Sequence, residues 1–257
     1  SSSSAASDVY KRQEWHRSTR VPRATGVNVN ATVCAACGGV SSPSCLYAPG
    51  CRHPQRVCAV NTCGDAIALL RQLVAVDSRN PSLVPGGPGE GAVAHALATT
   101  LDAWGFRTTL VEAAPGRPNV VARIGRPGGR VLLFNGHLDV VGVDGMLHPP
   151  FSAEERDGRI YGRGACDMKG GVAAMCAAAA RAAAEGLDGE IVITAVADEE
   201  YESLGTRALV ATGLRADAAI VTEPTRLAIN PAHRGFVWVE LDFRGRAAHG
   251  SRYDLGA

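Results

Sequence analysis

Apolar residues recur at helical spacing in the first regular part of the chain. Between residues 67 and 73 they fall on one helix face, at Ile67, Leu69, Leu70 and Leu73. We predict one helix from near Asp65 that ends before Arg79-Asn80-Pro81, and a second from Glu90 to Trp104. The Gly/Pro-rich segment 85–89 between them lacks the motifs of a phosphate-binding loop, so we interpret it as a turn.

Runs typical of β-strands then alternate with helical runs. Strands are predicted at 107–111, 119–124, 131–135, 190–197 and 218–222. The run 131–135 is apolar enough for a central strand covered on both faces. Between the strands we expect a hairpin around 156–159, an Ala-rich helix from about Lys169 to Ala184 and a helix near 206–211. This order predicts an α/β fold, a three-layer αβα sandwich with a mixed, mostly parallel sheet.

The two ends of the chain differ from this middle part. Residues 14–62 show little hydrophobic periodicity, and six cysteines crowd residues 34–63. We expect residues 1–64 to be a disordered or non-native leader; a zinc module built on Cys34 and Cys37 and a disulfide cluster are the alternatives. At the other end, residues 236–243 alternate as a half-exposed antiparallel strand would. We therefore expect one main domain at 65–232 and the start of another unit at 233–257.

Composition narrows the classes of partner. The chain has 26 Lys and Arg against 25 Asp and Glu, so it lacks the basic surface expected of a nucleic-acid-binding protein. Hydrophobic residues make up 46% of the sequence, yet no apolar run is long enough to span a membrane. We expect a globular protein in the cytoplasm with a small-molecule substrate.

Acidic and imidazole side chains follow the predicted strands and one glycine-rich turn. They are His137, Asp139, Asp167, Glu199, Glu200 and Glu223. Open α/β sheets build their sites at the carboxyl ends of strands, so these side chains can converge in one crevice. Gathering so many carboxylates is costly unless a divalent cation, or two, neutralises them. Mixed His and carboxylate ligands suit Zn, and also Co or Mn.

Each of these residues has a simpler interpretation when taken alone. His137 is compatible with a hydrogen-bonded core histidine, Asp139 with a turn and Asp167 with a helix cap. Glu199 and Glu200 are compatible with a solvated acidic loop. A histidine closely followed by an aspartate after a buried strand favours the metal, because the carboxylate can orient a ligating ring.

Five segments together resemble one family. They are Asn-Gly-His-Leu-Asp-Val-Val at 135–141, Gly-Arg-Gly-Ala-Cys-Asp-Met-Lys-Gly-Gly at 162–171, Asp-Glu-Glu at 198–200, Glu-Pro-Thr at 223–225 and Gly-Arg-Ala-Ala-His-Gly-Ser at 245–251. They resemble the motifs of the co-catalytic zinc family that contains acetylornithine deacetylase, succinyl-diaminopimelate desuccinylase, aminoacylase and the glutamate carboxypeptidases. The resemblance implies a zinc-exopeptidase-like fold with an inserted α+β lid and dimerisation domain, which would begin at 233–257.

The resemblance also implies a role for each motif residue. Asp167 would bridge two zincs, His137 and Glu223 would complete one site, and Glu200 would bind the other metal. Glu199 would be the general base, which takes a proton from the attacking water and passes it to the departing amine. Asp139 would orient His137. His249 would reach into a neighbouring subunit of a homodimer and stabilise the oxyanion, and a cis peptide is expected at Asp167-Met168.

The chain departs from the family pattern in three places. The family takes a further zinc-binding histidine from near the C-terminal end of its catalytic domain, after the lid, and the sequence given has no such residue. Gly142 stands where a proline often follows, and Met146 where a tryptophan is common. We therefore expect the chain itself to hold the second metal poorly, and expect the whole protein to be an amidohydrolase acting on N-acyl amino acids. An exopeptidase, a non-catalytic binding homologue and a cysteine-based zinc adaptor are the alternatives.

Overall fold

The computed structural model describes residues 63–232, a two-residue strand at 15–16 and, further along the chain, residues 235, 246, 248, 249 and 251–255. Contacts divide the chain into two units, Ser1–Pro224 and Thr225–Ala257. The predicted strand at 236–243 and the cysteines before Cys63 lie outside the described residues. The domain boundaries at 64 and 232 therefore stay predictions.

A five-stranded mixed sheet forms the centre of the first unit. Its order is β2-β3-β7-β4-β8. The strands are β2 (Arg107–Ala114), β3 (Arg117–Gly125), β4 (Val131–His137), β7 (Glu190–Val196) and β8 (Ala218–Val221). β2, β3 and β7 pair antiparallel, whereas β4 is parallel to both β7 and β8. The predicted α/β class with a mixed sheet is confirmed, but the sheet is not mostly parallel: two of its pairings are parallel and two antiparallel, because β2, β3 and β7 pair without a parallel crossover.

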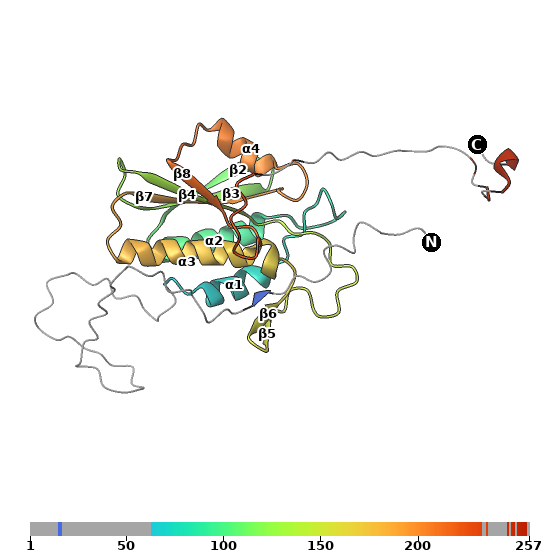
Figure 1. The fold of residues 1–257 in the computed structure, drawn as a ribbon, viewed down its shortest axis with the longest axis horizontal. Helices are drawn as coiled ribbons and strands as arrows, with labels where there is room; N and C mark the ends of the chain where they lie inside the picture. Colours follow the sequence, from blue (N-terminus) through green and yellow to red (C-terminus); the bar gives the residue numbers. More distant parts are fainter. Residues whose placement is uncertain are drawn as a thin grey trace, which may run out of the picture. The chain divides into compact units, whose positions relative to one another are not determined.

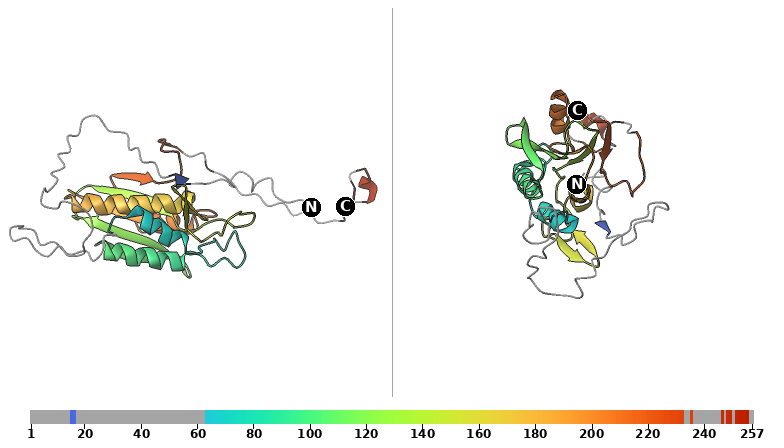
Figure 2. Two further views of the ribbon diagram at one scale, coloured as in Figure 1. Left: turned by 90° about the horizontal axis from the view of Figure 1, so that it is seen from below. Right: turned by 90° about the vertical axis from the view of Figure 1, so that its left-hand side faces the viewer.

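Helices lie on both faces of this sheet, as predicted (Figures 1 and 2). On one face α2 (Gly91–Ala103) packs against β2 and β3, α3 (Gly170–Ala184) packs against β3, β4 and β7, and α1 (Ala66–Val74) packs against both helices. On the other face α4 (Leu204–Ala211) covers β2 and β3. The main hydrophobic core is formed by helices α1 to α3 and the sheet. It includes the buried residues Leu69, Leu73, Leu97, Val172 and Ile193. None of the described helices has the length and apolarity needed to cross a membrane.

The prediction that residues 131–135, in β4, form the central strand covered on both faces is wrong. The strand in that position is β7. Every residue of β7 is buried, whereas the first five residues of β4 are only partly buried. The reason is position: β7 lies in the middle of the sheet, and α4 packs over the β2–β3 side, away from β4 and β8. Apolar composition alone does not distinguish the two strands.

Shorter elements surround the sheet. The predicted hairpin is present as β5 (Glu154–Arg156) and β6 (Arg159–Tyr161), and β1 (Trp15–His16) pairs with β6. A five-residue turn, η1 (Ala165–Lys169), in which Asp167 and Met168 have non-helical dihedral angles, leads into α3, and a short 3-10 turn, η2 (Tyr253–Leu255), lies in the second unit. Helix α1 ends at Val74, earlier than Asn80. Residues 78–80 instead run beside the end of β4, where the Asn80 N–H donates to the Val140 carbonyl at 2.9 Å.

Candidate metal centre

The parallel register of three strands brings the predicted site residues to one edge of the sheet. His137 is the last residue of β4 and pairs with Val196, the last residue of β7. Asn135 pairs with Val221, the last residue of β8. Glu199 therefore follows β7 by three residues and Glu223 follows β8 by two, beside His137.

Asp167 reaches the same place from the turn before α3. The turn begins at Gly164, whose φ of +78° favours glycine. A Cβ at this position would also lie 2.5 Å from Val140 Cγ1. The peptide bond Asp167-Met168 is cis, as the family resemblance predicted. The glycine lets η1 pack closely against the segment that follows β4.

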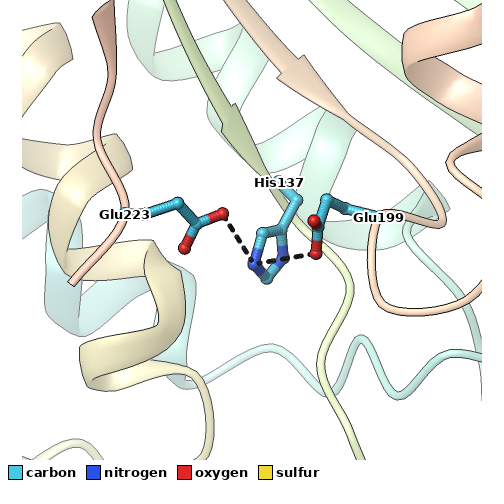
Figure 3. Close-up of side chains that lie close together, drawn as sticks. All are labelled: His137, Glu199 and Glu223. Atoms are coloured by element: carbon cyan, nitrogen blue, oxygen red, sulfur yellow. Dashed lines mark ion pairs between the residues drawn. The ribbon is translucent and has the colours of Figure 1, made fainter. Parts of the chain in front are cut away.

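His137 lies at the centre of the cluster (Figure 3). Its Nε2 lies 3.1 Å from Asp167 Oδ1, 3.7 Å from Glu199 Oε2 and 3.9 Å from Glu223 Oε1. Its Nδ1 lies 2.9 Å from the main-chain carbonyl of Asp139, and a donated hydrogen bond there leaves Nε2 facing the carboxylates. The imidazole is buried, so contacts with the protein fix its position.

The carboxyl groups of this cluster repel one another. Burial and the charges of Asp167, Asp139 and Glu199 together raise the pKa of Glu200 to about 8, against the opposing effect of His137. Burial, Asp167 and Glu199 together raise the pKa of Glu223 to about 7, again against the opposing effect of His137. Burial by itself lowers the pKa of His137, but the hydrogen bond to Asp167 and the nearby carboxylates outweigh it and raise the pKa to about 10.

The donor set fits a divalent cation. Ligand atoms of His137, Asp167 and Glu200 all lie within 4.8 Å of one another, and so do those of His137, Glu199 and Glu223. One imidazole nitrogen with several carboxylate oxygens is a combination that Zn, Co and Mn accept. A cation here would offset the repulsion that raises the pKa values of Glu200 and Glu223. The two groups share His137, so the geometry does not by itself separate the metal ligands from the general base.

Asp139 contacts the site in a way that the motif did not suggest. Its carboxylate Oδ1 lies 3.7 Å from His137 Nδ1, whereas its main-chain oxygen lies at hydrogen-bond distance from the ring. The carboxylate instead accepts hydrogen bonds from the main-chain N–H groups of Glu199, at 3.0 Å, and Glu200, at 3.1 Å. Asp139 is thus placed to hold the loop that carries both glutamates.

His249 belongs to the second unit, Thr225–Ala257. It is exposed, and its Nδ1 lies 2.9 Å from the Ser251 hydroxyl. Its predicted part in oxyanion stabilisation concerns another subunit and stays a prediction.

The sequence analysis did not predict the polar residues that bond to the aspartates beside the site. Asn80, Glu90 and Arg117 converge on Asp139 and Asp198, although they come from three separate segments. In the sequence, Asn80 only follows a predicted helix, Glu90 only begins another, and Arg117 lies outside the predicted strands. A buried position for them can be recognised only when the fold is known.

A buried histidine among carboxylates at the carboxyl edge of a mixed, helix-covered sheet defines an α/β domain with a candidate metal site. Comparison with known proteins agrees: residues 133–249 match peptidase family M20/M25/M40. The chain carries a domain of this family.

Two curated relatives are similar over much of the chain. Succinyl-diaminopimelate desuccinylase of Paracoccus denitrificans is 40% identical over 177 residues, which cover 63% of this chain and 46% of the relative. Acetylornithine deacetylase of Myxococcus xanthus is 39% identical over 197 residues, covering 74% of this chain and 50% of the relative. The chain therefore spans about half the length of the curated relatives it matches.

Two solved structures share the fold. An M20 family metallo-carboxypeptidase from Sulfolobus solfataricus matches with a TM-score of 0.54 and 26% identity, over 62% of this chain and 37% of that one. Human carnosine dipeptidase 1 matches with a TM-score of 0.54 and 29% identity, over 62% of this chain and 38% of that one.

Proposed function

We propose that the whole protein is a metal-dependent amidohydrolase that cleaves the amide bond of an N-acyl amino acid. The observation that carries the proposal is the buried His137 Nε2 facing Asp167, Glu199 and Glu223 within 3.9 Å. Glu200 adjoins this cluster. The similarity to a desuccinylase and a deacetylase, at 40% and 39% identity, supports acyl-amino-acid substrates.

The proposed ligands are divided between two zinc ions. Asp167 would bridge them, His137 and Glu223 would complete one site, and Glu200 would bind the other, with Co or Mn as possible substitutes. When bound, the metals supply Lewis-acid polarisation of the scissile carbonyl and lower the pKa of water. Histidine and carboxylates ligate in their deprotonated forms, so metal uptake would release the protons that His137, Glu200 and Glu223 hold.

Glu199 is proposed as the general base. Its main-chain N–H is held by Asp139, and its carboxylate lies 3.7 Å from His137 Nε2, beside the proposed ligands. From there it would take a proton from the attacking water and donate it to the leaving amine. For His249 the proposal rests on the motif at 245–251 alone: it would stabilise the oxyanion in a homodimer.

The two solved relatives support a second candidate. Both are named as peptidases, a carboxypeptidase and a dipeptidase, and both share the fold of this chain. The acyl-amino-acid substrate is preferred because the desuccinylase and the deacetylase have higher sequence identity. The proposed zinc identity and a cytoplasmic location stay predictions.

The test combines metal analysis with turnover. Zinc content is measured on this chain and on the whole protein, and hydrolysis of N-acetyl amino acids, N-succinyl amino acids and dipeptides is measured on the whole protein. We expect two zincs and acyl-amino-acid hydrolysis in the whole protein. Zinc-free protein without turnover would refute the proposal, and hydrolysis of dipeptides alone would favour the peptidase.

Glu199→Gln is the matching variant. It removes the proposed base but no proposed ligand, so activity should fall by at least about 100-fold while zinc content is unchanged. Glu200→Gln is the control, because loss of a ligand should lower the zinc content as well. A Glu199→Gln enzyme that keeps wild-type activity would refute the assignment of the base.

A further inference from the structure

A buried ion-pair network lies beneath the loop that carries Glu199 and Glu200. Arg117, at the start of β3, donates from Nε and Nη2 to both carboxylate oxygens of Glu90, at 2.8 and 2.6 Å. Its Nη1 lies 3.0 Å from Asp198 Oδ1. Glu90 and Asp198 are fully buried and the Arg117 side chain is 11% exposed. The guanidinium pairs with both acids, and its single positive charge offsets part of the cost of burying them.

Asp198 connects this network to the loop that carries Glu199 and Glu200. Glu90 Oε1 accepts the main-chain N–H of Asp198 at 3.1 Å, and Asp198 Oδ2 accepts the N–H of Glu202 at 3.1 Å. Asp198 has a φ of +61°, a conformation uncommon outside glycine. The hydrogen bonds made by the main chain and the side chain of Asp198 stabilise that conformation. Because Glu199 is the next residue, they also position its main chain.

Asn80 links the network to Asp139. Its Nδ2 donates to Asp139 Oδ2 at 2.7 Å and to Asp198 Oδ1 at 3.0 Å. Its Oδ1 accepts from Arg117 Nη2 at 3.2 Å and from the Ser82 N–H at 2.9 Å. This buried amide thus bonds to both aspartates that flank the glutamate loop.

We propose that Asn80, Glu90 and Arg117 are positioning residues for the metal centre. They fix Asp198 and Asp139, and those aspartates fix the main chain of Glu199 and Glu200 from two sides. The site itself is rich in mutually repelling carboxylates, and an ordered loop is needed to keep two of them facing His137. The inference rests on the proposed function, because it assumes that Glu200 binds a metal.

The test compares two Arg→Lys variants of the whole protein, which is expected to hold both metals. Arg117→Lys keeps the charge but loses the planar fork that contacts Glu90 and Asp198 together. Arg123→Lys is the matched control: Arg123 Nη1 pairs with buried Glu190 at 2.8 Å, at the opposite end of β7 from the glutamate loop. The metal-free proteins are titrated with CoCl2, and the visible absorption of bound Co(II) gives affinity and coordination. Thermal unfolding is followed in parallel.

We expect Arg117→Lys to bind Co(II) about 10- to 100-fold more weakly than the unmodified whole protein, with an altered spectrum. Arg123→Lys should lower the melting temperature but leave the titration unchanged. Equal titrations for all three proteins, or equal weakening in both variants, would overturn the inference. An unmodified whole protein that does not bind Co(II) would instead overturn the proposed function and the inference with it.

A second variant keeps the inference testable if Arg117→Lys does not fold. Asn80→Ala removes the amide that bridges Asp139 and Asp198 and leaves every charge in place. It should weaken Co(II) binding in the same direction. Asn80→Ala protein that folds and titrates like the unmodified whole protein would overturn the inference.

Discussion

Replacing Asp139 by asparagine measures how strongly its carboxylate holds the glutamate loop. Oδ2 accepts from Asn80 Nδ2 at 2.7 Å and from the Glu200 N–H at 3.1 Å, while Oδ1 accepts from the Glu199 N–H at 3.0 Å. An asparagine has one oxygen and one NH2 group. If its oxygen keeps the two bonds of Oδ2, its NH2 group faces the N–H of Glu199.

The magnitude follows from this loss. A hydrogen bond to a charged acceptor contributes about 1.5–3 kcal/mol, and the N–H left without an acceptor is partly buried. Part of this is offset, because burial raises the pKa of Asp139 and a neutral side chain is cheaper to bury. We expect Asp139→Asn to lower the free energy of unfolding by about 1–3 kcal/mol.

Urea unfolding of the chelator-treated chain is the assay, since it excludes any contribution from bound metal. Asp188→Asn is the control: its side chain is 96% exposed, so the change should stay within about 0.5 kcal/mol. If Asp139→Asn and Asp188→Asn unfold at the same urea concentration with the same slope, the carboxylate does not hold the loop.

Two further predictions concern packing and pH. In Gly171→Ala the new Cβ would lie 2.2 Å from the Thr222 carbonyl oxygen, next to Glu223, so we expect the free energy of unfolding to fall by about 1–3 kcal/mol and metal binding to weaken. Gly142→Ala is the control, because its Cβ would meet Val84 Cγ2 at an ordinary contact distance of 3.6 Å. Equal stability and metal binding of the two variants would contradict the prediction. Because the pKa values of Glu200 and Glu223 are raised from 4.5 to about 8 and 7, the folded metal-free chain binds more protons than the unfolded chain between pH 4.5 and 7. The melting temperature of the metal-free chain should therefore fall as pH rises through that range. Added zinc should raise the melting temperature most near pH 7. A melting temperature of the metal-free chain that rises with pH would refute the assigned pKa directions.

The sequence by itself determined the class of fold and predicted which side chains gather in one cluster. Alternating apolar runs predicted the main strands and helices between residues 66 and 221 to within a few residues, because local periodicity reflects which face of each element is buried. The positions of His137, Asp167, Glu199, Glu200 and Glu223 after strands or a glycine-rich turn predicted their convergence, and the structure places them together. Their individual roles stay predictions.

Only the tertiary structure decided which strand is central and what supports the site. Composition favoured β4 as the covered strand, but burial depends on neighbours in the sheet, and β7 has that position. Likewise, Asn80, Glu90 and Arg117 have no periodicity or spacing that relates them to Glu199. Apart from the Ser82 N–H, which bonds to Asn80, the partners of their side chains are 27 to 118 residues away in the chain, for instance Glu90 for Arg117 and Asp198 for Asn80. Such long-range polar contacts form because a buried charge must find a partner, and the fold decides which partner is within reach.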